Sequence, residues 1–307
     1  LSDAPIIIIE GDEYLASPID RRAKFLLYQP HICLISGIAW DHINVYPTFE
    51  SYTDSFKTLI AGLPKAGSLF FDQTDSVLNH LTADCPEHCE KTGYEAHPAK
   101  IENGQTILRG EDGKSYPIHV FGEHSLKNLN GARLICEQIG VSPTDFYEAI
   151  ATFKGAAKRL ELVASSETSL LYKDFAHAPS KVKATTQALK NQFPSRKLVA
   201  CLELHTFSSL NPAFLPEYAE TLNLADEAIV YLSEHAREIK RMDRMEESVV
   251  QTYFKHPNLK VIRDSETLKQ AILAQTWSNA NLLMMSSGTF DGLDLPALGN
   301  EMGLLSV

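Results

Sequence analysis

Acidic and imidazole side chains follow two strongly apolar segments near the start of the chain. Four consecutive isoleucines, residues 6–9, lead directly into Glu10, and a second apolar segment, residues 32–35, is soon followed by His42. Unbroken β-branched runs are typical of strands that are covered on both faces, as in parallel sheets. Open α/β sheets bind ligands just beyond the carboxyl ends of their strands. We therefore expect Glu10 and His42 to meet at one sheet edge, where they would suit a divalent cation that carries nucleotide phosphates.

Length and composition indicate an ordinary globular protein of two domains. The chain has 307 residues, of which 44% are hydrophobic, and a formal net charge of −11. This charge argues against a protein that coats nucleic acid or a membrane surface. No segment is apolar for long enough to span a bilayer, and no signal peptide is recognisable. The odd number of cysteines, five, favours free thiols in a reducing compartment, so we expect a cytoplasmic protein. The sequence indicates nothing about its oligomeric state.

The first half of the chain mixes helical and strand patterns. We expect helices at 49–63, 76–81, 125–139 and 143–153, and strands at 6–9, 32–35, 68–71, 106–109, 116–120 and 160–163. The segment Gly110–Gly113, which contains an Asp-Gly turn, predicts a β-hairpin between two of these strands. A polar linker at 164–168 marks the expected domain boundary, which gives domains 1–163 and 164–307.

The second half alternates regularly between strand and helix patterns. We expect strands at 169–172, 197–201, 227–231, 259–262 and 282–285, and helices near 180–192, 214–222, 243–254 and 265–278. Repeated βα units with short links imply a mostly parallel sheet with right-handed crossovers. The sequence therefore predicts an α/β protein whose second domain is Rossmann-like.

Cysteine and histidine residues in the polar segment 82–100 form a weak metal-binding pattern. Cys85, His88, Cys89 and His97 are residue types that bind zinc, so a zinc-dependent hydrolase is one alternative function. There is no C-x-x-C pair, however, and the segment is acidic, which favours a plain surface loop.

Polar residues at two expected helix and strand ends could contact a nucleotide. His124 and Asn128 lie one turn apart at a helix start and could address a base edge or a ribose, whereas helix capping explains Ser125 alone. Arg159 lies between a helix and a strand, where its planar guanidinium suits phosphate oxygens. A solvated turn is the simpler interpretation of Arg159.

Two further turns follow strands of the second domain. Asp174–Pro179 comes after its first strand, and Met285–Gly292 comes after its last. Such turns are favoured ligand sites in doubly wound domains. The alternative is that His177 is a plain loop residue and that the glycines only relieve backbone strain.

Taken in order, these segments resemble the Mur ligase family, ATP-dependent enzymes that form amide bonds in bacterial cell-wall synthesis. The resemblance rests on short motifs in a specific order: Ile9–Tyr14, Arg22–Phe25, Asp41-His42, Phe121–His124, Gly155 with Arg159–Glu161, and Asp174–His177. It implies an α/β fold in which part of a central ATPase domain, a parallel sheet with an added small β-hairpin, precedes a Rossmann-like C-terminal domain. It also implies ATP and Mg²⁺ as cofactors and UDP-N-acetylmuramate and a peptide as substrates, joined through an acyl phosphate.

Two features favour the branch of the family that recycles peptidoglycan. Glu13-Tyr14 and Lys24-Phe25 resemble that branch, which joins the tripeptide L-Ala-γ-D-Glu-meso-diaminopimelate to UDP-N-acetylmuramate. The alternatives are the branch that adds L-alanine and a non-catalytic module that binds nucleotide or peptide.

The resemblance also implies roles for individual residues. Glu10 and His42 would coordinate magnesium and act in catalysis together with Arg159. The implied nucleotide-binding residues are His124, Asn128, Arg159 and Asp174. The implied substrate-binding residues are His177, His205 and Ser287.

The chain departs from the family pattern at several positions. Gly37 stands where an asparagine is expected, and Ala178 replaces the second histidine of a His-His-Pro motif. The arginine-bearing loop that faces the incoming peptide is missing around 203–209, with His205 at or near its place. The phosphate-binding loop and the UDP-binding domain of the family would lie upstream of Leu1. We therefore expect a C-terminal fragment that does not turn over ATP alone.

Overall fold

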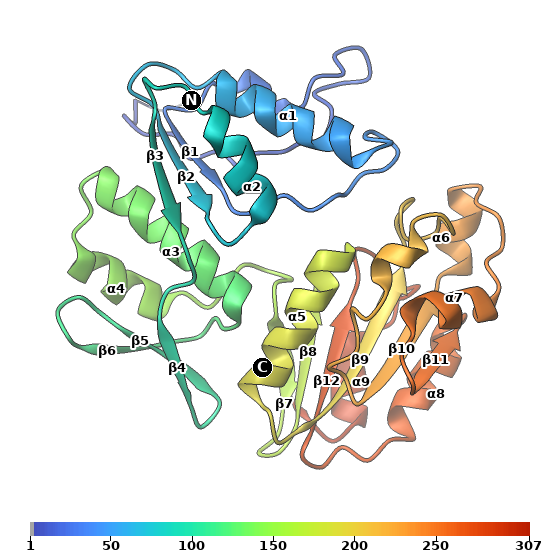
Figure 1. The fold of residues 1–307 in the computed structure, drawn as a ribbon. Coiled ribbons are helices and arrows are strands. Elements are labelled where there is room, and N and C mark those ends of the chain that lie inside the picture. The colour runs from blue at the N-terminus through green and yellow to red at the C-terminus, as the bar shows by residue number, and fades with distance from the viewer. Residues whose placement is uncertain (1–2) are drawn as a thin grey trace. The chain divides into compact units, whose positions relative to one another are not determined.

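The computed structural model describes residues 3–307, and they form two compact units. Unit 1 comprises the described residues up to Glu95 together with Asn130–Gln138, and unit 2 comprises Ala96–Leu129 and Ile139–Val307. Both combine helices and strands (Figure 1), as the sequence predicts. The domain boundary expected between residues 163 and 164 stays a prediction.

Unit 1 contains a three-stranded parallel sheet. Its order is β1 (Ile32–Ile35), β2 (Ser68–Asp72) and β3 (Glu90–Tyr94). Helices α1 (Phe49–Ala61) and α2 (Ser76–Leu81) connect and cover these strands, and short 3-10 helices form at η1 (Lys24–Leu27) and η2 (Thr82–Asp84). Cys33 and Ile35 alternate along β1 into a buried cluster that includes Phe56 and Ile60 of α1. Three predicted elements of this unit, 32–35, 68–71 and 76–81, are confirmed.

The strand expected at residues 6–9 is wrong. Ile6, Ile7, Ile8 and Ile9 are 48%, 68%, 90% and 53% exposed and form no strand. An isolated extended segment leaves its backbone N–H and C=O groups without ladder partners, so an apolar run becomes a strand only beside another strand. No described strand pairs with this run.

Helix α3 (Glu123–Gln138) begins in unit 2 and ends in unit 1. Within unit 1, Gly131 allows the helix to approach β1 and β3 closely. A Cβ atom at this position would lie 2.9 Å from Leu34 Cδ1 and 3.0 Å from Tyr94 Cζ, closer than packed cores permit. Leu34 thus faces α3 while its neighbours in β1 face α1.

Unit 2 begins with a small antiparallel sheet. Strands β4 (Ala99–Glu102), β5 (Gln105–Arg109) and β6 (Ser115–Ile118) pair in that order, and α4 (Pro143–Thr152) packs against β6. The predicted hairpin between β5 and β6 is confirmed. Strands β3 and β4 were not predicted, although Asn103-Gly104, with φ values of 51° and 77°, is a typical two-residue hairpin turn.

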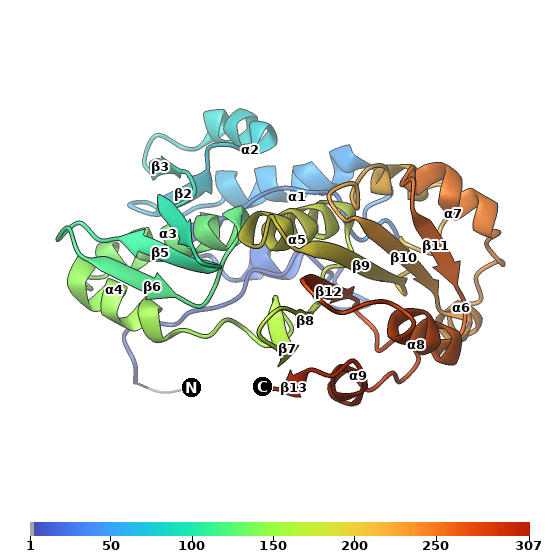
Figure 2. The same ribbon diagram turned by 90° about the horizontal axis from the view of Figure 1, so that it is seen from below.

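The main sheet of unit 2 has seven strands in the order β11-β10-β9-β12-β8-β7-β13. The five parallel strands are β8 (Leu170–Asp174), β9 (Lys197–Leu204), β10 (Glu227–Leu232), β11 (Leu259–Ile262) and β12 (Ala280–Met285). Antiparallel β7 (Glu161–Ser165) and β13 (Leu305–Ser306) complete one side. Helix α5 (Pro179–Gln192) covers one face, and α8 (Ser265–Leu273) and α9 (Leu295–Glu301) cover the other (Figure 2). The predicted parallel, doubly wound arrangement is confirmed.

Three expected helices of unit 2 are shorter than their apolar patterns, and one of them, expected at 265–278, ends at Leu273. The segment 214–222 forms only the 3-10 helix η3 (Leu215–Tyr218), and Glu220, with φ +63°, ends the helical path. The segment 243–254 becomes helical only at α7 (Glu247–Phe254). Helix α6 (Glu234–Ile239), which Ser233 caps through Ala236 N, was not predicted.

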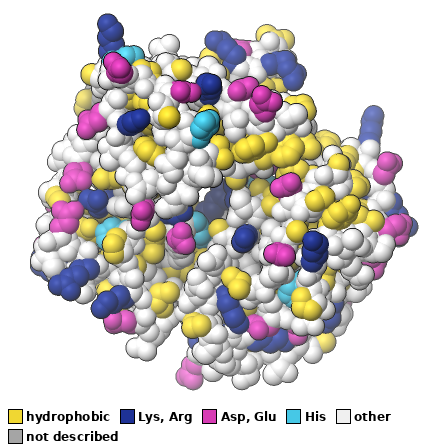
Figure 3. All heavy atoms as spheres, in the orientation of Figure 1, with side chains coloured by type: hydrophobic (Ala, Val, Ile, Leu, Met, Phe, Trp, Pro, Cys, Tyr) yellow, Lys and Arg dark blue, Asp and Glu magenta, His cyan; other side chains and the backbone are white. Residues whose placement is uncertain are grey.

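Charged side chains of both signs are interspersed over the face that Figure 3 shows. Such a mixture of charges is typical of globular protein surfaces. Among residues 3–307, no helix is both long and apolar enough to cross a membrane.

Candidate functional site

The loops that follow β1 and β2 meet at the carboxyl edge of the unit 1 sheet. Asp75 links them, because its Oδ2 accepts a hydrogen bond from Ile38 N at 2.8 Å while its Oδ1 caps α2 through Val77 N at 2.9 Å. Gly37, which precedes this contact, has a φ of +152°, a conformation that favours glycine. Gly37, which stands where the family pattern has an asparagine, therefore lies at a position whose backbone conformation favours glycine.

His42 lies in this loop and contacts Glu13. Its Nε2 is 3.3 Å from Glu13 Oε1, and its ring meets the Tyr14 ring edge-on, with centroids 5.2 Å apart. The Glu13 carboxylate also accepts a hydrogen bond from Tyr52 OH at 3.4 Å. His42 has a φ of +56°, and strained non-glycine conformations of this kind cluster at functional sites.

Glu10 directly follows the isoleucine run of unit 1. It is exposed in an irregular segment, and its carboxylate forms no hydrogen bond or ion pair with a described residue. Its pairing with His42 in a metal site stays a prediction. The carboxylate in contact with the His42 ring is that of Glu13.

The structure does not support the zinc alternative. His88 Nε2 lies 3.0 Å from Leu63 O, and the ring nitrogens of His97 lie 2.8 Å from Pro98 O and from Tyr147 OH. Over residues 3–307, no three histidine, cysteine, aspartate or glutamate side chains are arranged to hold a metal ion. The cysteine and histidine residues of this segment serve packing and hydrogen bonding.

In unit 2, Asp174 at the end of β8 organises two turns. Its Oδ2 accepts a hydrogen bond from Leu160 N at 2.7 Å, and its Oδ1 accepts one from Ala176 N at 2.6 Å. The side chain is 8% exposed. Because it joins the turn before β7 to the turn after β8, Asp174 places Arg159 next to the carboxyl end of β8.

Arg159 and Asp174 both lie close enough to His124 to affect its pKa. The Arg159 guanidinium stacks on the Phe175 ring, 5.2 Å from its centroid. Burial lowers the pKa of His124, Asp174 opposes this shift, and Arg159 adds to it. The structure thus brings together three of the residues predicted to bind nucleotide. Asn128, the fourth, is exposed one turn further along α3.

The His124 ring has a free hydrogen-bonding position. Its Nδ1 is buried and has no partner among the described residues. Because the lowered pKa favours the neutral imidazole, Nδ1 can donate or accept one hydrogen bond, depending on the tautomer. A ligand with a complementary polar edge would satisfy this atom.

A second group of polar residues lies at the carboxyl ends of β9 and β12 in unit 2. Glu203, in β9, is 1% exposed, and its Oε2 accepts hydrogen bonds from Ser286 Oγ and from Phe290 N, the latter at 2.9 Å. Glu203 Oε1 and Ser287 Oγ are buried without a partner among the described residues. Burial raises the pKa of Glu203, and the neighbouring Asp291 adds to this rise, whereas its two hydrogen bonds oppose it.

Asp291 is presented by a strained turn after β12. Phe290 and Asp291 have φ values of 52° and 53°, which are unfavourable for residues with a Cβ atom. The Asp291 carboxylate is exposed at the surface but is held by hydrogen bonds from Tyr231 OH and Ser233 Oγ, both 2.7 Å long. Two side chains from β10 and its following turn thus fix a carboxylate beside Glu203.

His205 follows β9 and packs against the turn after β12. A Cβ atom at Gly288 would lie 2.6 Å from His205 Cδ2 and 2.9 Å from Glu203 Oε2, so only glycine allows this approach. Burial, followed by the charge of Lys240, lowers the pKa of His205. His205 and Ser287, both predicted to bind substrate, therefore lie around the same buried carboxyl group.

His177 follows β8, and its backbone is anchored. Tyr218 OH donates a hydrogen bond to His177 O, and His177 Nδ1 lies 2.9 Å from Phe175 O. His177 is also among the groups whose charge lowers the pKa of His205. The three predicted substrate-binding residues therefore lie on loops at the same edge of one sheet.

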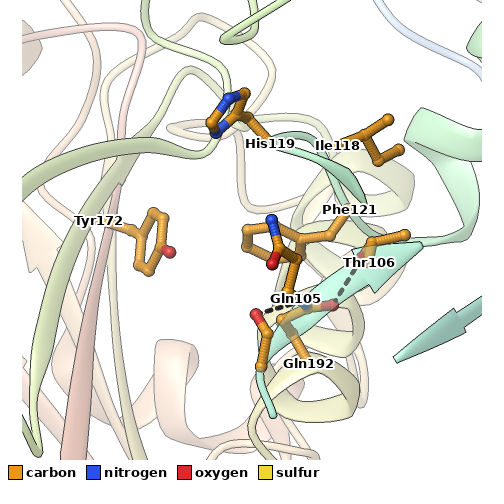
Figure 4. A pocket seen from close by; sticks show the side chains of 8 residues that line it. Gln105, Thr106, Ile118, His119, Phe121, Tyr172 and Gln192 are labelled. Atoms are coloured by element: carbon orange, nitrogen blue, oxygen red, sulfur yellow. Dashed lines mark hydrogen bonds between the residues drawn. The ribbon is translucent and has the colours of Figure 1, made fainter. Parts of the chain in front are cut away.

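A separate pocket lies between the small antiparallel sheet and the main sheet of unit 2 (Figure 4). Its volume is about 220 Å³, and its lining includes His119, Phe121, Tyr172 and Gln192. The Gln192 side chain bridges its floor, donating to Gly104 O at 2.7 Å and accepting from Thr106 Oγ1 at 3.1 Å. None of the predicted site residues lines this pocket, and its polar groups hold α5 to the β4–β5 turn.

The sequence interpretation missed Glu13, Glu203, Asp291 and Lys240 as potential site residues. Glu203 gave the clearest available signal, because a glutamate directly follows the buried run Leu198–Leu202 inside a parallel strand. A charged residue in such a position is buried and must have hydrogen-bond partners. The other three depend on loop conformation, which no local pattern specifies.

The matches to known proteins agree with this architecture. Residues 2–136 match the Mur ligase middle domain, and residues 158–288 match the Mur ligase glutamate ligase domain. The UDP-N-acetylmuramate–L-alanyl-γ-D-glutamyl-meso-2,6-diaminoheptandioate ligase of Escherichia coli (strain K12) is 26% identical over 95% of this chain and 64% of its own length. A UDP-N-acetylmuramate–L-alanine ligase of Caldicellulosiruptor bescii is 30% identical over 73% of this chain and 50% of its own length. The chain thus spans about half to two thirds of these relatives.

Solved structures show the same fold at lower sequence identity. A murein peptide ligase of Psychrobacter arcticus 273-4 superposes with a TM-score of 0.64 at 19% identity, covering 97% of this chain and 63% of the other. Folylpolyglutamate synthase of Mycobacterium tuberculosis, solved with ADP and AMPPCP, gives 0.64 at 16% identity, covering 91% and 66%. With both of its domains matched, the chain belongs to the Mur ligase family.

Proposed function

We propose that the protein is an ATP-dependent ligase that joins a peptide to the carboxyl group of UDP-N-acetylmuramate through an acyl phosphate. The observation that carries this proposal is the group of polar loops at the carboxyl edge of the unit 2 sheet, in a chain that matches both Mur ligase domains. Ligands of doubly wound sheets bind at this edge. We place the reaction in the cytoplasm, in peptidoglycan recycling.

His124, Asn128, Arg159 and Asp174 are the proposed nucleotide-binding residues. Arg159 offers a guanidinium that Phe175 holds by stacking and that can pair with phosphate oxygens. Asp174 positions Arg159 through its bond to the neighbouring Leu160 N. His124 Nδ1 offers one unsatisfied polar atom to a base or ribose. A fixed cation beside the transferring phosphoryl group would stabilise the charge that develops there.

Magnesium would be held by Glu10 and His42. The Glu10 carboxylate fits this role, because no described residue occupies its oxygens and magnesium is commonly bound by one or two carboxylates together with phosphates and water. The His42 ring fits less directly, since its Nε2 already contacts Glu13. When bound, the ion supplies charge stabilisation for the phosphoryl group. Glu13 would act as a positioning residue for the His42 ring.

His177, His205 and Ser287 are the proposed substrate-binding residues at the entry of the amine. Their loops surround Glu203 and Asp291, so the site offers both hydrogen-bonding and charged groups to a zwitterionic substrate. Holding the amine there provides the proximity that amide formation from an acyl phosphate requires. We propose that the amine is supplied by the tripeptide L-Ala-γ-D-Glu-meso-diaminopimelate. The reason is that Glu13-Tyr14 and Lys24-Phe25 resemble the recycling branch of the family.

The test is a ligation assay with the complete gene product. Phosphate release and product formation are measured with ATP, Mg²⁺, UDP-N-acetylmuramate and either the tripeptide or L-alanine. We expect kcat/KM for the tripeptide to exceed that for alanine by about 100-fold or more. A preference for alanine would assign the protein to the alanine-adding branch. Ligand binding without acyl-phosphate formation from either pair would overturn the proposal in favour of a binding module.

A further inference from the structure

Lys240 and Asp291 lie within electrostatic reach of the same two groups in unit 2. Lys240 lowers and Asp291 raises the pKa of Glu203, and both also act on His205, in each case with burial as the largest effect. Lys240 follows α6, and Asp291 follows β12. One cation and one anion therefore act electrostatically on the buried carboxyl group of Glu203.

Lys240 differs from Arg237 and Arg263 in that no carboxylate neutralises its charge. Arg237 and Arg263 lie 2.6 Å and 2.5 Å from Glu234, and Arg263 lies 3.3 Å from Glu247. Lys240, in contrast, forms no ion pair with a carboxylate of the described residues. A partly buried ammonium group without a counter-ion is a natural binding point for an anionic ligand.

An aromatic ring holds Lys240 over the loop that follows β9. Its Nζ lies 5.6 Å from the centroid of the Phe207 ring, within the range of a cation–π interaction. The Phe207 side chain is 46% exposed and belongs to the same loop as His205. The ammonium group is thereby held near the predicted substrate-binding residues.

His205 is not the positive charge of this site at neutral pH. Burial and the adjacent Lys240 lower the pKa of His205 from its ordinary value of 6.5. Its imidazole is therefore uncharged at neutral pH, where it can only offer hydrogen bonds. A permanent cation in this part of the site has to come from another residue.

Two buried polar atoms in this part of unit 2 have no hydrogen-bond partner among the described residues. Glu203 is 1% exposed, and its Oε1 has no partner among residues 3–307. Ser287 Oγ is in the same situation on the opposite loop. Since unsatisfied buried polar atoms are unfavourable, both atoms indicate a site that is completed by a bound molecule.

We propose that Lys240 is a specificity-determining residue that binds a carboxylate of the incoming peptide away from its reacting amine. This inference rests on the proposed ligase function. A peptide that contains γ-linked glutamate and diaminopimelate has carboxylates remote from the amine that attacks, whereas the carboxylate of free alanine is adjacent to its amine. A cation in a fixed position therefore favours the peptide.

The experiment compares Lys240→Ala, Lys240→Arg and Lys260→Ala in the complete gene product. Lys260 is a matched control, because it pairs with Glu227 at the amino edge of the same sheet, 3.9 Å away. We expect Lys240→Ala to raise KM for the tripeptide about tenfold, with kcat and the KM for ATP within about twofold of the original protein. Lys240→Arg should restore most of the affinity, and Lys260→Ala should change nothing.

Amidated peptides identify the group that Lys240 binds. Tripeptides in which one carboxylate at a time is an amide are measured with the original protein and with Lys240→Ala. For one of them the two proteins should have the same KM, because the interaction is already absent. High salt should weaken peptide binding in the original protein more than in the variant.

The outcomes separate this inference from the proposed function. Ligation of the tripeptide with an unchanged KM in Lys240→Ala would overturn the role of Lys240 and leave the ligase proposal intact. An equal rise in the KM values for ATP and peptide would also overturn it, as a general structural effect. If calorimetry and the ligation assay both show no interaction of the original protein with the tripeptide, both proposals are wrong.

Discussion

The two parallel sheets of this chain present their carboxyl edges very differently. In unit 2, five parallel strands share one carboxyl edge, where backbone groups of neighbouring turns donate hydrogen bonds to Glu203 and Asp174. In unit 1, three strands are parallel, and β1 leads into the loop that carries His42. The carboxylate predicted to join His42, that of Glu10, lies on an exposed segment without strand partners. The comparison shows that a ligand site at a sheet edge depends on the neighbouring strands as much as on the residues themselves.

The proposed metal site in unit 1 provides the most demanding test of this comparison. We expect Glu10→Gln and His42→Ala to lower kcat of the complete gene product about 100-fold or more, since each removes a group proposed to stabilise phosphoryl transfer. Glu13→Gln should cost only about tenfold, because Glu13 acts on the ring of His42 rather than on substrate. Steady-state rates over a magnesium titration measure both effects.

The control for these variants is Glu50→Gln, on the first turn of α1, which should keep full activity. Glu13→Gln should also raise the magnesium concentration needed for half-maximal rate. If Glu13→Gln is as damaging as His42→Ala while Glu10→Gln is harmless, Glu13 rather than Glu10 is the carboxylate of the metal site.

In unit 2, the buried Glu203 side chain links β9 to the turn after β12. We expect Glu203→Ala to lower the free energy of unfolding by about 3 kcal/mol, because it removes the acceptor for Ser286 Oγ and Phe290 N and leaves a cavity. Ser286→Ala, which removes only one of these contacts, should cost about 1 kcal/mol. Urea unfolding followed by circular dichroism gives both values. A loss below 1 kcal/mol for Glu203→Ala would show that the turn after β12 is held by other contacts.

Strands were predicted more reliably in unit 2 than in unit 1. The apolar runs of unit 2 predicted its five parallel strands correctly. Repeated βα units bring such runs side by side, so each run has a strand to pair with. The isoleucine run before Glu10 has an equally strong pattern and forms no strand, because a run does not specify its partners. Strand β3, in contrast, has the weak pattern Glu90–Tyr94 and forms because β2 pairs with it.

Site residues were predictable where they directly follow a strand. His177 and His205 come straight after β8 and β9, so topology alone brings them to one edge. Lys240 and Asp291 reach the same edge only through the turn after α6 and two left-handed residues at Phe290 and Asp291. Such conformations depend on tertiary contacts, such as those from Tyr231 and Ser233, and are not encoded in a local pattern.

The smallest predicted effect concerns how the free energy of unfolding depends on pH. Glu203 and Glu234 of unit 2 should contribute to this dependence with opposite signs. Burial raises the pKa of Glu203 above its ordinary value of 4.5, so the folded state binds this proton more tightly than the unfolded chain does. The resulting stabilisation is fully present below pH 4.5 and is lost as pH rises through the folded-state pKa. Glu203→Gln lacks this dependence, so its stability relative to the original protein should increase as pH rises above 4.5.

Glu234 should show the opposite sign. Burial alone would raise its pKa, but hydrogen bonds and charges from Arg237 and Arg263 lower it overall from 4.5. Its stabilisation is therefore present above pH 4.5 and is lost as pH falls through the folded-state pKa, so the stability deficit of Glu234→Gln should shrink on acidification. Thermal or urea unfolding of both variants, from well below pH 4.5 up to pH 8, yields two difference curves. Opposite slopes are expected, because the first carboxyl group is buried beside another acid and the second is paired with two arginines. A flat difference curve for Glu203→Gln would mean that Glu203 ionises at the same pH in the folded protein as in the unfolded chain. The edge of the unit 2 sheet would then be more hydrated than the burial of Glu203 indicates.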